Sequence, residues 1–423
     1  MEHLASHPVL ALALLAATFL LVNAFVAWAS ARRQERVAAL LAQLQALPSA
    51  PGRTPVTLVT GFLGSGKTTL LNHLLRHPPQ GVRLAVLENE RGATALDHEL
   101  LAAGGGGAED STSGGLRILL LANGCMCCSS AEAAGRGDLE RSLEALLALG
   151  APQPPGGAAA DHIVVEASGL ADPAPLVHAL LALGARASAR FFLAGVVAVC
   201  DAAHLAHHLD ARGLLSRATE AGQQLAFADL VLVNKADAAG PGALAGALAA
   251  AARVNPTARL LPCTRAEVEP ALVLDVRALD PGRALAALGG GWGVAAGAPP
   301  PRARHAPGVA ALSLPPLPAA GPRLPSEAHL LAWLQRTIEA HARALYRVKG
   351  LVACAESGGR EVLFVQGVHA SLQVARVPMA SLRGSGSGRQ AAPARLGLVL
   401  IGLGLPQEEL AASFAREVWP REE

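Results

Sequence analysis

Eight residues of this chain form a glycine loop of the kind that holds phosphate groups, Gly61-Phe62-Leu63-Gly64-Ser65-Gly66-Lys67-Thr68. The loop matches G-x-x-x-x-G-K-[ST] in full, a spacing that directs backbone N–H groups at phosphate oxygens. Lys67 is one of only three lysines in the chain, and its compact ammonium can bridge β- and γ-phosphate oxygens during phosphoryl transfer. The Thr68 hydroxyl can ligate Mg²⁺. The loop therefore predicts a site for a nucleoside triphosphate and Mg²⁺.

A second lysine lies in Asn234-Lys235-Ala236-Asp237, directly after the apolar run 230–233. The carboxylate of Asp237 can accept hydrogen bonds from guanine N1 and N2, whereas adenine offers no such pair of donors. The alternative is a polar turn after a strand, but Asn-Lys is an odd turn in a chain so poor in lysine. We expect GTP as the nucleotide.

Glu166 ends another apolar run, 162–165, and is followed by Ala167-Ser168-Gly169. An acidic residue at a strand tip beside a phosphate loop can hold Mg²⁺ through water or orient the attacking water. We expect Glu166 to act with Lys67 in catalysis and with Thr68 in binding magnesium. The alternative is a solvated carboxylate at the end of a strand.

Three cysteines are crowded into four residues, Cys125, Cys127 and Cys128. Thiolates at this spacing suit Zn²⁺ and compete well for other late first-row ions such as Co²⁺. Three ligands leave a tetrahedron incomplete, so an exchangeable ligand or a distant residue would finish it. Redox chemistry and inert buried thiols are the alternatives. The spacing is too tight for an ordinary disulfide framework and indicates a reducing compartment.

Other residues of metal-ligating type are predicted to be structural. Cys200, Cys263 and Cys354 are dispersed along the chain, which is typical of core positions. His204 and His208 would share one face of a helix and could hold an ion transiently. A solvated helix face is the favoured interpretation of these histidines.

The elements that must position the motifs alternate between strands and helices. Strand-like runs lie at 56–60, 84–87, 118–121, 162–165, 195–200 and 230–233, with helical stretches between several of them. This alternation predicts an α/β fold, a P-loop NTPase domain whose mostly parallel sheet is covered on both faces. The motifs follow the carboxyl ends of the strands, where open α/β sheets bind ligands. We place this domain at residues 54–288.

A smaller second domain is predicted at residues 305–419, after a Gly- and Pro-rich linker at 289–304. A helix at about 326–345 precedes strands at 346–354, 361–368 and 396–401, and a last helix lies near 407–416. This pattern is α+β. We expect a sheet with two helices on one face.

The N-terminus carries a hydrophobic helix at residues 1–31, followed by a linker at 32–53. Residues 8–29 hold no charge and, at about 1.5 Å per residue, could cross a bilayer. Arg32, Arg33 and Arg36 follow, so the positive-inside rule predicts a single-pass membrane protein with the GTPase domain in the cytosol. The alternatives are an organellar targeting segment, a signal peptide or a misassigned start codon. Without the segment the chain would be cytoplasmic.

Composition excludes one class of partner. The net charge of +2 and an aromatic content of 3% provide neither a basic stripe nor stacking platforms. Nucleic acid is therefore not expected as a ligand.

Taken together, the motifs closely resemble the CobW-type family of P-loop GTPases. The likeness runs from about residue 54 to 414 and includes Arg347-Val348-Lys349-Gly350 and Val365-Gln366-Gly367-Val368 in the second domain. The segment 88–93 is similar to the family's Glu-Asn-Glu-Phe-Gly-Glu but holds Arg91 and Ala93. The resemblance implies a phosphate site at Gly64 to Thr69, a Walker-B-like Glu166, a guanine reader in Asn234 and Asp237, and metal binding by the cysteine block.

Members of this family handle metals, so the resemblance implies a GTP-hydrolysing metallochaperone or insertase. We expect GTP, Mg²⁺ and a transition metal, zinc first and cobalt second, with a client metalloprotein as partner. The sequence leaves the oligomeric state open. A membrane-tethered regulatory GTPase whose cysteines sense metal or redox state is the alternative. A second alternative is an ATP-dependent P-loop enzyme, but the Asn-Lys-x-Asp motif argues against it.

The predicted nucleotide site is made of the backbone and side chains of these residues: Gly61, Gly64, Ser65, Gly66, Lys67, Thr68, Thr69, Asn234, Lys235 and Asp237.

Overall fold

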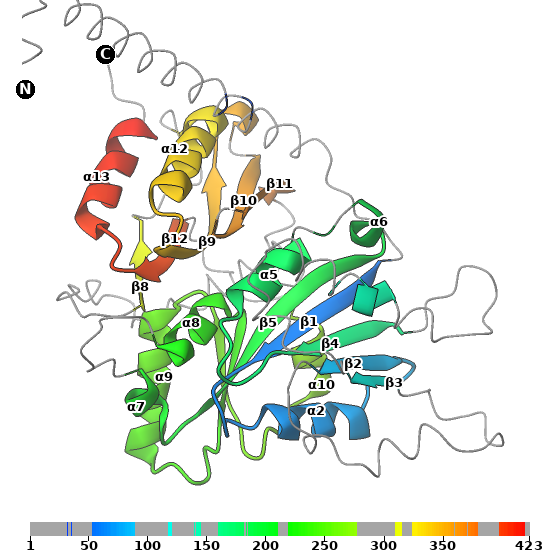
Figure 1. Ribbon diagram of the computed structural model, residues 1–423. Helices are drawn as coiled ribbons and strands as arrows, with labels where there is room; N and C mark the ends of the chain where they lie inside the picture. Colours follow the sequence, from blue (N-terminus) through cyan, green and yellow to red (C-terminus); the bar gives the residue numbers. More distant parts are fainter. Residues whose placement is uncertain are drawn as a thin grey trace, which may run out of the picture.

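The computed structural model places two β-sheets side by side, each with its own helices (Figure 1). It describes residues 53–88, 117–120, 141–144, 160–181, 185–209, 219–276, 309–314, 324–358, 360–369, 371–379 and 397–418, together with residues 32, 35, 139 and 183. The predicted anchor at 1–31, the altered segment around Arg91 and Ala93, and the three clustered cysteines lie outside these residues. Within the described part of the chain, no helix is long and apolar enough to cross a membrane.

The first sheet has seven strands in the order β3-β2-β4-β1-β5-β6-β7, all parallel. The predicted parallel sheet is thereby confirmed. Strands β4 and β6 are buried along their whole length, and β1 and β5 at all but one residue, which matches their runs of Val, Ile and Leu. The strands are β1 (Thr54–Thr60), β2 (Leu84–Glu88), β3 (Arg117–Leu120), β4 (His162–Glu166), β5 (Phe191–Asp201), β6 (Leu230–Asn234) and β7 (Arg259–Pro262).

Helices cover both faces of this sheet. On one face, α2 (Lys67–Arg76) and α10 (Pro270–Leu274) pack on the side chains of Val59, Val86 and Val164. The other face is covered by α5 (Ala174–Leu181), α8 (Glu220–Phe227) and α9 (Pro241–Val254). Two short helices also lie in the described part of this domain, α6 (Ala185–Ser188) and α7 (Leu205–His208).

The second sheet has five antiparallel strands in the order β11-β10-β9-β12-β8. Helices α12 (Glu327–Ala340) and α13 (Gln407–Glu417) cover one face, as predicted, and the rings of Trp333 and Phe414 meet edge to face at 5.0 Å. The strands are β8 (Val309–Ser313), β9 (Leu345–Ala353), β10 (Glu361–Val368), β11 (Ser371–Pro378) and β12 (Gly397–Leu403), and a 3-10 turn spans Ala355–Ser357.

The opposite face of the second sheet packs on the first domain. Tyr346, Val368, Val399 and Ile401 belong to the same buried cluster as residues of β1, β4, α5 and α8. In Figure 1 the second sheet lies beyond α5 and α8, on the side away from α2. The two sheets therefore share a hydrophobic core through this face.

Candidate nucleotide-binding site

The glycine loop joins β1 to the N-terminus of α2, the strand-loop-helix context that a phosphate site requires. Gly61 and Gly66 have φ angles of 146° and 109°, a left-handed region that side chains rarely adopt. A Cβ on Gly61 would lie 2.2 Å from the Val199 carbonyl oxygen, and one on Gly66 would lie 2.3 Å from Nδ2 of Asn234. Glycine is therefore required at both positions by conformation and by space.

Lys67 is the first residue of α2, and its side chain folds back over the loop. The Nζ atom donates to the Gly61 carbonyl oxygen at 2.9 Å, and the residue is 6% exposed. An ammonium has three N–H donors, so it can donate to phosphate oxygens as well as to a carbonyl oxygen. The N-terminal end of the helix adds its own N–H groups and partial positive charge. Thr68 is half-buried and Thr69 exposed at the same helix end.

Glu166 lies beside the glycine loop. It ends β4 and pairs in register with Val59 of β1, shortly before that strand enters the loop. On the other side it is the register partner of Glu88 in β2. Its side chain is 0% exposed, so the alternative of a solvated strand-end carboxylate is wrong. A buried carboxylate next to a phosphate loop supplies the oxygen ligands that Mg²⁺ prefers.

The Asn-Lys-x-Asp motif begins at the end of β6, two strands away from β1. Asp237 is exposed, and Lys235 has a φ angle of 59°. The Lys235 Nζ donates to Oδ2 of Asp201, the last residue of β5, at 2.9 Å. Burial would raise the pKa of Asp201, but hydrogen bonds from Lys235 and His204 lower it to about 2. Asp201 is therefore an anion that holds the lysine side chain in place. This role was not predicted from the sequence, although Asp201 directly follows the strand predicted at 195–200.

Asn234 ties three parts of the site together. Its side-chain Nδ2 donates to the Ser65 carbonyl oxygen in the glycine loop at 2.9 Å. Its Oδ1 accepts from the backbone N–H of Ala266 at 2.8 Å and faces the Cys263 thiol at 3.7 Å. The asparagine thus uses both ends of its amide within the protein.

The loop after β7 was not singled out from the sequence. It carries Arg265 and Ala266, with φ angles of 51° and 55°, at the same edge of the sheet. Two consecutive left-handed residues other than glycine are uncommon and mark strain that surrounding contacts hold in place. The bond from Ala266 to Asn234 is one such contact.

Of the other residues singled out from the sequence, the dispersed cysteines are buried as predicted, and the three histidines lie on and beside the short helix α7. His204 and His207 are exposed, and the His208 ring lies 4.4 Å from that of Phe62. Among the residues that the structure describes, no group of three His, Cys, Asp or Glu side chains could hold a metal ion. Cys200, Cys263 and Cys354 are buried free thiols, and burial raises the pKa of Cys200 to about 12 and that of Cys263 to about 11. Thiols of this kind are unreactive.

The structure therefore brings the glycine loop, Glu166 and the Asn-Lys-x-Asp motif together at the carboxyl edge of β1, β4, β5 and β6. The metal ligands Cys125, Cys127 and Cys128 fall outside the described residues, so their predicted role remains a prediction. Gln224 is a further residue that sequence reasoning missed. It is 2% exposed and donates to the carbonyl oxygens of Gly169 and Ala171, in the loop that follows Glu166.

Comparison with known proteins gives two family matches. Residues 55–262 match the CobW/HypB/UreG nucleotide-binding domain, and residues 322–417 match the cobalamin synthesis protein cobW C-terminal domain. The first match covers the seven-stranded sheet, and the second covers the five-stranded sheet apart from β8.

Curated relatives are similar over part of the chain. Zinc chaperone YjiA of Escherichia coli (strain K12) is 35% identical over 185 residues, which cover 44% of this chain and 50% of that protein. Zinc chaperone CobW of Pseudomonas aeruginosa is 34% identical over 252 residues, covering 53% and 60%. The chain thus spans about half to three fifths of the length of these relatives.

The fold is also that of a solved structure. A crystal structure of Zn(II)-bound YjiA GTPase from E. coli superposes with a TM-score of 0.58 at 22% identity, covering 88% of this chain and all of that one. This likeness extends over both sheets. With its nucleotide-binding and C-terminal domains both matched, the chain belongs to the CobW-type family of P-loop GTPases.

Proposed function

We propose that this protein is a GTP-hydrolysing metallochaperone. It binds a divalent transition metal at Cys125, Cys127 and Cys128, zinc first and cobalt as the second choice, and transfers it to a client metalloprotein. The assignment of GTP as the nucleotide rests on one observation: Asn234 of the Asn-Lys-x-Asp motif is hydrogen-bonded to Ser65 of the glycine loop. The metal half rests on the cysteine spacing and on relatives named zinc chaperones.

In this proposal GTP lies along the carboxyl edge of the sheet and is hydrolysed to GDP and phosphate. The N-terminus of α2 and Lys67 hold the β- and γ-phosphates, and Asp237 accepts from the guanine ring. Asn234 positions the loops around the nucleotide, because its amide is already hydrogen-bonded to the backbone of Ser65 and Ala266. Glu166 orients the attacking water at the γ-phosphate.

The donor set also fits magnesium. The hydroxyl of Thr68 and the carboxylate of Glu166 are oxygen ligands. Thr68 is the second residue of α2 and Glu166 is the last residue of β4, so both lie beside the glycine loop. Bound there, Mg²⁺ would neutralise charge on the phosphate oxygens. The protein's own part is to present these oxygens at the same edge of the sheet as Lys67.

The nucleotide and the transferred metal are coupled in this proposal. GTP binding favours the arrangement of the cysteine block that holds the ion, and hydrolysis releases the ion to the client. A ligand shifts a conformational equilibrium only through differential affinity for its two states, so metal and GTP must each strengthen the binding of the other.

Metal titration tests the proposal. The purified chain is titrated with Zn²⁺ and with Co²⁺ under reducing conditions, with and without GTP–Mg²⁺. The triple variant Cys125→Ser, Cys127→Ser, Cys128→Ser serves as comparison. Cys354→Ser is a matched control, because it makes the same substitution in the core of the second domain. We expect one tight ion that GTP strengthens, retained in the control and lost in the triple variant.

Two other outcomes would change the assignment. If GTP leaves metal affinity unchanged, the coupled mechanism is wrong. If no tight site forms in either nucleotide state, the cysteines are sensors or structural, and the regulatory GTPase becomes the better interpretation. Transfer of bound ⁶⁵Zn to a metal-free client distinguishes delivery from sensing.

Membrane anchoring is a separate proposal that rests on the uncharged residues 8–29 and on the arginines after them. Fractionation of cells that express the full chain, or a chain without residues 1–31, tests it. The full chain should sediment with membranes and resist extraction by carbonate, and the shortened chain should not. Equal behaviour of the two would refute the anchor.

A further inference from the structure

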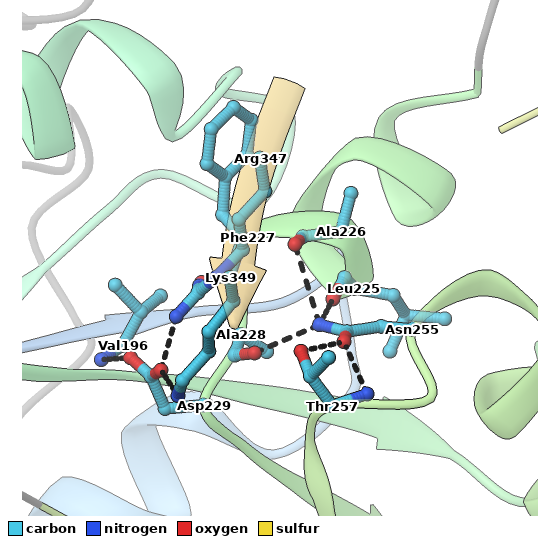
Figure 2. Close-up of polar contacts among 10 residues, drawn as sticks. All are labelled: Val196, Leu225, Ala226, Phe227, Ala228, Asp229, Asn255, Thr257, Arg347 and Lys349. Atoms are coloured by element: carbon cyan, nitrogen blue, oxygen red, sulfur yellow. Dashed lines mark hydrogen bonds and ion pairs between the residues drawn. The ribbon is translucent and has the colours of Figure 1, made fainter. Parts of the chain in front are cut away.

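Helix α8 lies between the nucleotide site and the second domain and contacts both. One of its side chains holds the loop that follows Glu166, while its C-terminal end is bonded to β9 of the second sheet. Figure 2 shows this end of the helix, where Phe227, Asp229, Arg347 and Lys349 meet. The helix therefore offers a physical connection between the two domains.

At the nucleotide side, the contact is made by Gln224. Its buried amide Nε2 donates to the Gly169 carbonyl oxygen at 3.1 Å and to that of Ala171 at 3.4 Å. Gly169 packs closely on the glycine loop, since a Cβ added there would lie 2.6 Å from the Leu63 side chain. Gln224 thus fixes the segment that leads away from Glu166 against the phosphate loop.

At the other end, Arg347 of β9 donates from Nη1 to the Phe227 carbonyl oxygen, the last of α8, and from Nη2 to the Asp229 carboxylate. Lys349 donates to the same carboxylate oxygen at 3.0 Å. Burial alone would raise the pKa of Asp229, but the two cations hold it below its usual value. Arg347 is the member of this cluster that also bonds α8.

The helix itself is held as a stiff body. Thr219 caps its N-terminus by accepting from Gly222 N–H at 3.1 Å. At the C-terminus, Asn255 donates to the carbonyl oxygens of Leu225 and Ala228, each at 2.8 Å. These bonds satisfy end groups of α8, which opposes fraying of the helix between Gln224 and Arg347's partner Phe227.

The aromatic residues around Arg347 reinforce the connection. The Phe227 ring lies 5.9 Å from that of Tyr346 and 5.6 Å from that of His369, both in the second domain. Phe227 is fully buried in the core that the domains share. The end of α8 is therefore bound to the second domain by packing as well as by hydrogen bonds.

We infer that Arg347 and Gln224 are positioning residues for GTP hydrolysis, which act through α8 so that the placement of the second domain sets the loop behind Glu166. The inference rests on the proposed GTPase activity. Neither residue touches the reacting atoms. Their effect is on the rate of the chemical step and not on nucleotide affinity, because the glycine loop and Asn-Lys-x-Asp motif bind GTP without them.

The chain offers a matched pair of variants for the test. Arg347→Met and Lys349→Met each remove one cation from Asp229 and leave the other in place, but only the first breaks the bond to α8. Gln224→Met removes the amide at the opposite end of the helix. Arg347→Lys keeps the positive charge but cannot bond Phe227 and Asp229 with two separate nitrogens. This variant replaces Arg347→Met in the test if Arg347→Met does not fold.

For each full-length variant we would measure single-turnover hydrolysis of GTP with Mg²⁺, GTP affinity and melting temperature. Gln224→Met and Arg347→Met should each slow hydrolysis about tenfold, a typical coupling magnitude, with affinity within about twofold of wild type. The double variant should be no slower than the slower single variant, because both changes act through one helix. Lys349→Met should hydrolyse GTP at the wild-type rate, although its melting temperature falls.

The outcomes distinguish failure of the proposed function from failure of the coupling through α8. A wild-type chain that neither binds nor hydrolyses GTP overturns the proposed function, and the inference with it. If the wild type is active but Arg347→Met and Lys349→Met lose rate equally, the cluster only stabilises the fold and the coupling is refuted. Rate losses that multiply in the double variant would also refute a shared path through α8.

Discussion

Replacing Asn234 by alanine should weaken GTP binding, although Asn234 is predicted to act within the protein more than on the nucleotide. The change removes the donor to the Ser65 carbonyl oxygen at 2.9 Å and the acceptor for Ala266 N–H at 2.8 Å. Both partners are backbone groups of loops at the nucleotide site. The residue is 2% exposed, so water replaces neither bond directly.

The magnitude follows from these two contacts. A buried polar group left without its partner costs about 1–3 kcal/mol, so two such groups put the loss of stability at about 2–6 kcal/mol. GTP binding requires the glycine loop to be ordered. In the variant, GTP has to order the loop that one of these bonds orders in the wild type. If this costs about 1.4 kcal/mol of binding energy, Kd rises about tenfold.

The assay compares two asparagines. Asn255→Ala is the control, because Asn255 is also fully buried and donates to backbone carbonyl oxygens, but at the C-terminus of α8. Urea denaturation should show a loss of stability in both variants, and fluorescent GTP should bind more weakly to Asn234→Ala alone. If Asn234→Ala binds GTP like the wild type while losing stability like Asn255→Ala, the tie to the glycine loop does not support nucleotide binding.

Three further predictions concern single side chains. Asp237→Asn should lower the preference for GTP over ATP by about 10- to 100-fold, the value of a hydrogen bond to a charged group, and xanthosine triphosphate should then bind better than GTP in a competition assay. Lys67→Ala should weaken GTP binding by at least about tenfold for the same reason, as measured by calorimetry. Burial lowers the pKa of His162 from 6.5 to about 4, so between these values the unfolded chain binds a proton that the folded chain does not. Stability should therefore fall as the pH drops from about 6.5 to 4, by roughly 1.4 kcal/mol per pH unit at most, and urea denaturation of His162→Gln should lack this part of the slope.

Much of the site could be predicted because its signals are local. The glycine loop, Glu166 at a strand tip and Asn-Lys-x-Asp are each contained in a few consecutive residues. The buried strands before them are apolar runs, which are readable without knowledge of their neighbours. In the second domain, the strand predicted at 361–368 has the same bounds as β10.

Elements with weak local signals were missed. Strand β7 has only four residues, all half-buried or exposed, and ends in a proline at the edge of the sheet. Its loop with Ala266 was missed as well. Strands β8 and β11 are the two edges of the second sheet. Edge strands carry a less regular apolar pattern, because neighbours and solvent decide their pairing.

The contacts between the domains were beyond sequence reasoning for a different reason. Asp229 precedes an apolar strand and resembles a solvated residue of a turn, whereas the structure buries it beneath two cations from β9. Arg347 and Lys349 alternate with apolar residues, which does place them on one face of a strand. Nothing local indicates that the face is buried, because its cover comes from residues more than a hundred positions earlier.

The shared core has a consequence for the order in which the protein can fold during synthesis. Phe227 and the α5 face of the first sheet are completed early, but the residues that cover them include Val399 and Ile401 near the end of the chain. At about 5–20 residues per second, a ribosome needs roughly 10–35 s to proceed from Phe227 to Ile401. For that interval an apolar face of the nascent first domain is exposed to other chains and to chaperones. A protein of this build should therefore depend on translation speed and holdase capacity for its yield, and its isolated first domain should aggregate.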